Sequence, residues 1–155
     1  MSSKTDYFEN KLTDVLWRGQ SLTIGASTLS WSTAPTFYIG LLTTAPTDSS
    51  AGVEATGGSY ARQPITAALA NFAGTQAAAS TLASSGTGGT TSNNAVITFS
   101  SMPDTTTTTV KAFGIYDAST AGNLLEYASF LTPVAASAGA TMTFAAGALT
   151  IQEDN

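Results

Sequence analysis

The sequence contains no histidine and no cysteine among its 155 residues, and only 15 of those residues are charged. Histidine and cysteine are the side chains that most often transfer protons, attack as nucleophiles or bind zinc near neutral pH. Their absence excludes a Ser-His-Asp or Cys-His catalytic site, and we expect neither a metal site nor a cofactor. Because no disulfide can form, the fold does not depend on an oxidising compartment.

Positive charge is also scarce. Five basic residues stand against ten acidic ones, for a net charge of −5. Binding to the phosphates of nucleic acids needs clustered lysine and arginine, so we expect no nucleic-acid partner. The sequence has no long apolar run and no apolar segment behind a basic start, so we expect neither membrane insertion nor a signal peptide.

Small residues dominate the composition. Alanine, threonine, serine and glycine together supply 85 residues, more than half of the chain. The larger apolar side chains must therefore gather in a few segments to form a core. This composition favours a structural or binding role over an enzymatic one.

The first 19 residues predict a helical segment, with a helix over residues 6–18. Asp6 and Glu9 have the spacing of a capping box, and Gly19 stands where a helix often ends. Two interpretations are open: the helix packs on its own domain, or it lies on a partner subunit. The candidate subunit-interface residues are one apolar stripe and the tryptophan that follows it, namely Phe8, Leu12, Val15, Leu16 and Trp17.

From residue 20 onward, short runs rich in β-forming residues alternate with turn residues. Residues 117–123 are polar and contain glycine between two strong strands, which predicts a hairpin. We therefore expect an all-β fold, an antiparallel β-sandwich or jelly-roll-like domain over residues 20–155, with one short N-terminal α-helix. The expected strands are residues 22–24, 37–42, 60–66, 95–99, 110–116, 124–131, 141–144 and 148–151.

One long segment stands apart within this domain. Residues 73–94 are of low complexity, rich in alanine, serine, threonine and glycine. Loops of this length in a compact domain are commonly binding loops or mobile segments, although a plain solvated loop is the alternative.

Two weaker candidate sites remain. Asp104, Asp117 and Glu126 could supply the paired carboxylates of a glycan hydrolase, against the interpretation that they are turn and surface residues. A candidate glycan contact is formed by Tyr60 with Arg62 and Gln63, because sugar-binding platforms combine an aromatic ring with polar neighbours.

Several motifs occur in order along the chain and resemble a known family. They are KLTD with WRG (11–14 and 17–19), YIGLLTTAPTD (38–48), GGSYARQ (57–63), TSN leading into ITF (91–99), FGIYDA with GNLL (113–118 and 122–125) and FAAGAL (144–149). In these motifs the sequence is similar to small bacteriophage virion proteins of the tail fibre and minor structural type. The resemblance implies a component of the virion, made in the cytoplasm of the bacterial host.

The expected function is that of a non-enzymatic, self-associating subunit of a tail fibre or of a similar appendage at the tail or head–tail region. Its expected partners are itself, as a homodimer, and other virion proteins. A capsid decoration protein is the alternative within this class. A module that binds carbohydrate on the host surface, with host-surface glycan as its partner, and a carboxylate-dependent hydrolase are the alternatives from other classes.

Overall fold

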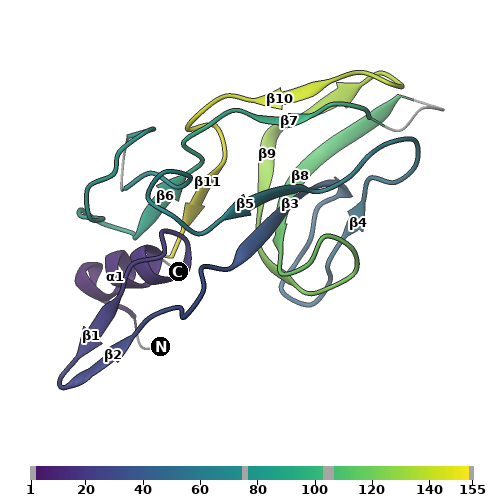
Figure 1. The fold of residues 1–155 in the computed structure, drawn as a ribbon. Helices are drawn as coiled ribbons and strands as arrows, with labels where there is room; N and C mark the ends of the chain where they lie inside the picture. Colours follow the sequence, from purple (N-terminus) through teal and green to yellow (C-terminus); the bar gives the residue numbers. More distant parts are fainter. Residues whose placement is uncertain (1–2, 75–76, 103–106, 154–155) are drawn as a thin grey trace. The chain divides into compact units, whose positions relative to one another are not determined.

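The computed structural model describes residues 3–74, 77–102 and 107–153. The chain forms two compact units. Figure 1 shows the ribbon coloured along the sequence. Unit 1 comprises residues 1–35, 66–96 and 145–155, and unit 2 comprises residues 36–65 and 97–144. The single domain expected over residues 20–155 stays a prediction, and the two units are described one at a time.

Unit 1 contains the helix α1 (Asp6–Leu16) and two small antiparallel sheets. Strands β1 (Leu22–Ile24) and β2 (Ser27–Leu29) form a hairpin, and β6 (Thr90–Ser92) pairs with β11 (Thr150–Gln152). Its buried apolar side chains include Val15, Trp17, Leu22, Phe72, Leu149 and Ile151. The rings of Trp17 and Phe72 pack against each other with centroids 6.0 Å apart.

The helix begins where the sequence predicts but is capped by a different residue. Thr5 is the N-cap, and its side-chain oxygen accepts a hydrogen bond from the backbone N–H of Phe8. The predicted capping box of Asp6 and Glu9 is therefore wrong, because a capping box places the acidic residue three positions after the cap. The helix ends at Leu16, two residues earlier than predicted, and Gly19 follows with φ +67°.

Unit 2 is built on one five-stranded antiparallel sheet. Its strands lie in the order β4 (Val53–Glu54), β3 (Thr36–Thr44), β8 (Thr108–Tyr116) and β9 (Leu124–Ala136), and β5 (Gln63–Thr66) also pairs with β3. The hairpin predicted around residues 117–123 is confirmed, since β8 and β9 pair antiparallel across it. Gly40 on β3 lies beside the ring of Tyr116 and the carboxylate of Glu54, where an added Cβ would come within 2.9 Å of each.

A second layer of unit 2 is the two-stranded ribbon of β7 (Ile97–Phe99) and β10 (Met142–Phe144). Five aromatic rings connect this ribbon to the sheet in a row, with successive centroids 5.9, 6.1, 5.6 and 6.2 Å apart. We call them the aromatic row; in order they are Tyr60, Phe99, Phe144, Phe130 and Phe113. Offset and edge-to-face contacts of this kind add to the stabilisation that burial provides.

The prediction of an all-β chain with one short N-terminal helix is confirmed. A jelly-roll topology stays a prediction. Three strands were missed, namely β2, β4 and β6, and the strand expected over residues 60–66 begins only at Gln63. The candidate carboxylate Asp104 lies outside the described residues.

Candidate functional site

The polar face of α1 holds the segment that the sequence marks as low in complexity. The side-chain amide of Asn10 donates to the carbonyl of Gly86 at 2.8 Å, and the hydroxyl of Thr13 donates to the carbonyl of Gly89. Both side chains are buried, although they are polar. The low-complexity segment is thus tied to the helix through its backbone.

Arg18, just after the helix, completes this attachment. Its side chain is fully buried and forms an ion pair with Asp14. Its guanidinium also donates to three backbone carbonyls, those of Phe72 at 3.1 Å, Ser80 at 3.3 Å and Leu82 at 2.6 Å. Five N–H donors in a planar fork suit arginine to this role, because several carbonyls must be satisfied at once.

The predicted interface residues of the helix fall into two groups. Val15 and Trp17 are buried within unit 1, and the indole N–H of Trp17 donates to Glu153 at 2.8 Å. Phe8 is exposed, and Leu12 and Leu16 are half-buried. Packing on its own unit therefore accounts for Val15 and Trp17, whereas Phe8 remains accessible.

In unit 2, a cluster of charged and aromatic side chains surrounds Arg62. Its guanidinium binds Glu54 through two bonds, from Nε to Oε1 at 2.9 Å and from Nη2 to Oε2 at 2.7 Å. The guanidinium carbon also lies 3.4 Å from the centre of the Tyr116 ring. This geometry combines a bidentate ion pair with a cation–π contact, and both favour arginine over lysine.

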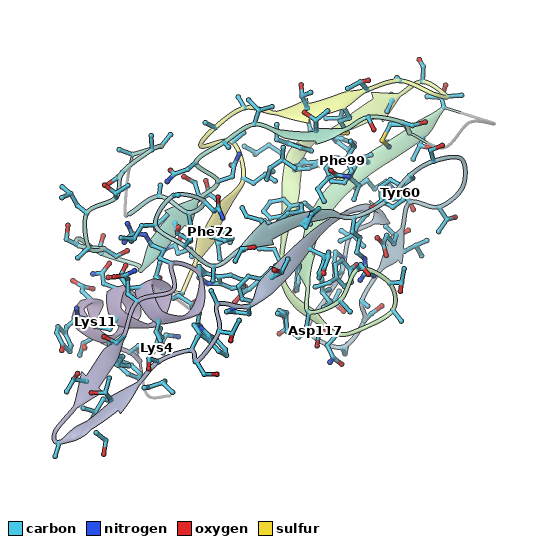
Figure 2. All side chains as sticks on the ribbon, viewed as in Figure 1. Lys4, Lys11, Tyr60, Phe72, Phe99 and Asp117 are labelled. Atoms are coloured by element: carbon cyan, nitrogen blue, oxygen red, sulfur yellow. The ribbon has the colours of Figure 1, made fainter. Side chains whose placement is uncertain are left out.

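Tyr60 belongs to the same cluster. Its hydroxyl accepts a bond from the backbone N–H of Leu41 at 2.7 Å and donates to Glu54 at 3.1 Å. Its ring stacks on Phe99, and Figure 2 shows these two side chains next to each other. Burial, with a smaller contribution from Glu54, raises the pKa of Tyr60 well above its usual value, so the phenol keeps the proton that it donates.

The cluster also fixes the hairpin loop between β8 and β9. Arg62 Nη1 donates to the carbonyls of Ala118 and Ala121, each at 2.7 Å. Beside this contact lies a hollow of about 310 Å³. Glu54, Thr56, Tyr60, Arg62, Ser119 and Thr120 are among the residues that line it. Gln63 is not among them, and its side-chain amide donates to the carbonyl of Ala61 at 2.8 Å.

In each unit, then, an arginine holds backbone in place, Arg18 in unit 1 and Arg62 in unit 2. Over residues 3–152 the chain matches the family described as "Podophage GP4 fiber I protein gp80". The chain belongs to this podophage fibre family. A search of curated proteins found no match to it.

This podophage fibre protein has ten acidic residues and no histidine or cysteine. Within residues 3–74, 77–102 and 107–153, no three His, Cys, Asp or Glu side chains are grouped so as to hold a metal ion. In that same part of the chain, no helix is both long and apolar enough to cross a membrane. Of the candidate carboxylates, Asp117 accepts bonds from both the backbone N–H and the side-chain amide of Asn123, each at 2.7 Å.

The sequence of this fibre protein predicted a site with Tyr60 and Arg62 but not Glu54, whose carboxylate binds both of them. The signal was weak, because Glu54 lies in a two-residue strand and eight positions before its arginine. One cue was available: a lone acidic residue in an almost uncharged stretch, near one of only five basic residues. The buried pair of Asp14 and Arg18 had a clearer signal, the i, i+4 spacing of opposite charges on a helix.

The loop of residues 117–123 gives a pH-dependent prediction. Hydrogen bonds from the side chain and backbone of Asn123 lower the pKa of the Asp117 carboxyl. The bonds are thus complete above the usual aspartate pKa of about 3.9 and are lost as the pH falls through the lowered value. We expect the Asn123 amide resonance to stay constant down to about pH 4 and to shift only below it.

NMR titration of the backbone amides measures this. An Asp117→Asn variant is the control, because its side chain cannot titrate and the shift of Asn123 should disappear. A midpoint at or above the usual aspartate value would contradict the prediction.

Proposed function

We propose that this chain is a non-enzymatic structural subunit of a phage tail fibre, or of a similar appendage at the tail or head–tail region, and that it self-associates as a homodimer. The family match over residues 3–152 carries the proposal, since that family is described as a fibre protein. Two-fold dimers are the commonest closed assemblies, which makes them the simplest form of self-association.

The use of charge in the two units supports a structural role. Arg18 and Arg62 are each bound to a carboxylate and to backbone carbonyls of their own unit. Catalytic sites instead keep acids and bases poised toward a substrate. Ion pairs and hydrogen bonds of this kind hold the loops in one conformation. A subunit that is repeated in an assembly needs such a fixed conformation.

Mass spectrometry of purified virions, together with immunogold labelling, tests this proposal. We expect the chain to be present in the particle and located at the tail. Its absence from purified virions would overturn the structural role.

A capsid decoration protein is the second candidate of the same class, and copy number separates the two. A fibre subunit should be present in tens of copies at one vertex, whereas a decoration protein should be present in hundreds over the shell. Quantitative mass spectrometry against the major capsid protein gives this number.

A carbohydrate-binding module on the fibre is the candidate from another class. The hollow beside Arg62 favours it, because the sequence-predicted Tyr60 and Arg62 both line a space near the lower limit of ligand pockets, roughly 300–1,000 Å³. A glycan array would compare wild type with Thr120→Trp, which should fill the hollow without touching the Arg62 ion pair. Binding by wild type that the variant loses supports this candidate, and no binding by wild type counts against it.

A further inference from the structure

The β1–β2 hairpin of unit 1 leaves large apolar side chains uncovered. Ile24 is 62% exposed and Leu29 is 57% exposed. Tyr7 and Phe8 of α1 and Trp31, which follows the hairpin, are also exposed. We call three of these residues, which follow one another in the charge-free stretch after the helix, the hairpin surface: Ile24, Leu29 and Trp31.

The structure places the hairpin against the helix. The indole N–H of Trp31 donates to the backbone carbonyl of Val15 at 2.6 Å, so the chain after β2 is fixed to α1. Leu22 is buried and lies opposite Leu29 in the hairpin. Because side chains alternate along a strand, Ile24 shares the face of Leu22. Leu22, Ile24 and Leu29 thus share one face of the hairpin. Of these three side chains, Leu22 is buried, and Ile24 and Leu29 are exposed.

This part of the chain carries no charge. Residues 19–47 contain no Asp, Glu, Lys or Arg. Depletion of charge, together with aromatic side chains, marks the core of protein–protein interfaces rather than the solvated surface. Exposed apolar residues scattered singly need no explanation, but a hairpin and the tryptophan that follows it, with three of them in one charge-free stretch, do.

The hairpin itself is short. It has three residue pairs, and within the described residues β1 and β2 pair only with each other. An isolated two-stranded hairpin is marginally stable, and its free edges can accept a further strand. Contact with a partner would both cover Ile24 and Leu29 and stabilise the two strands.

We propose that the hairpin surface binds the hairpin surface of a second copy of this chain. A two-fold contact pairs the same surface of both copies, and residues near its axis meet their own equivalents, so a charge near the axis would meet a like charge. The chain as a whole carries a net charge of −5, which opposes self-association, but residues 19–47 are neutral. An antiparallel edge strand is likewise complementary to itself. This inference rests on the proposed self-association and names the surface responsible for it.

The test replaces the two most exposed aliphatic residues of the hairpin surface. In an Ile24→Asp/Leu29→Asp variant of the full chain, the dissociation constant of the dimer should rise at least roughly tenfold over that of wild type, because charge is introduced at the centre of the contact. Sedimentation equilibrium measures this constant. Leu131→Asp is the matched control. Leu131 is fully exposed on β9 in unit 2, so the same change there should leave the assembly intact.

A milder variant guards against misfolding of the hairpin. Ile24→Thr/Leu29→Thr places a β-branched residue, which favours strands, in each strand and should weaken the assembly in the same direction. Far-ultraviolet circular dichroism reports the fold of both variants, because the emission of Trp31 would also respond to the contact itself.

Each outcome has one meaning. If wild type is a monomer at all concentrations, the proposed self-association fails and the surface assignment fails with it. If wild type associates and the folded hairpin variants associate equally well, only the assignment of the surface is overturned. Loss of assembly in Leu131→Asp but not in the hairpin variants would place the contact on unit 2 instead.

Discussion

Replacing Arg18 with methionine is expected to lower the free energy of unfolding by roughly 3–5 kcal/mol, the usual effect of breaking a buried ion pair from one side. The Asp14 carboxylate would stay buried without its cation, although it accepts bonds from the backbone N–H of Ser84. The carbonyls of Phe72 and Leu82 would lose their donor as well. Buried polar groups without a partner are costly, so the loss exceeds that of a single hydrogen bond.

Urea denaturation followed by tryptophan emission measures this effect, because both tryptophans lie in unit 1. Lys11→Met is the control for the change in charge, since Lys11 is only half-buried. In Asp14→Leu/Arg18→Met neither partner is left as an unpaired charge, and it should recover part of the lost stability. A loss of less than about 1 kcal/mol in Arg18→Met, as for an exposed pair, would contradict the prediction.

Phe99→Ala should have an effect of similar size in unit 2, roughly 3–5 kcal/mol, because truncating a buried phenylalanine removes its burial and leaves a cavity. Phe99 is 1% exposed. It stands inside the aromatic row, stacked on Tyr60 on one side and edge-on to Phe144 on the other. Its loss therefore separates the β7–β10 ribbon from the cluster around Arg62.

Hydrogen exchange followed by mass spectrometry locates this effect. Peptides from residues 36–65 and 97–144 should exchange faster in the variant. Leu131→Ala is the matched control, because Leu131 is exposed and its truncation should change stability by less than about 0.5 kcal/mol. Unchanged exchange across β3 and β8 would show that the aromatic row does not hold unit 2 together.

Strong local patterns made most of the fold predictable. Alternation and turn residues located β3, β8 and the start of β9 to within two residues, whereas β9 runs five residues beyond its predicted end. Strands β2, β4 and β6 were missed because they have two or three residues each, mostly serine and threonine in two of them. Such short strands are determined by their partners in the fold and carry no periodicity of their own. For β6 that partner is β11, which lies far along the chain.

The helix shows the limit of pattern reasoning at the candidate site. Its apolar stripe suggested which face is buried, yet the polar residues Asn10, Thr13 and Asp14 are buried too. Their partners are backbone groups of a segment without hydrophobic pattern. Side-chain sequence does not encode the position of a backbone carbonyl, so this contact could not be predicted. The same holds for Arg62 and the carbonyls of Ala118 and Ala121.

The attachment of the low-complexity segment has an evolutionary consequence. Arg18, Asn10 and Thr13 bind its carbonyl oxygens, which every amino acid possesses. Side chains such as Leu82 point into solvent and make no demand on that attachment. Mutations at the exposed positions of this stretch can therefore accumulate while its path stays the same. The conditions are that its length is kept, together with Gly89, which lies against Glu9 with φ +49°, and with the buried Thr91 and Asn93, whose side chains donate to backbone carbonyls. A phage could therefore change the solvent-exposed side chains of this stretch without changing the helix residues that bind its backbone.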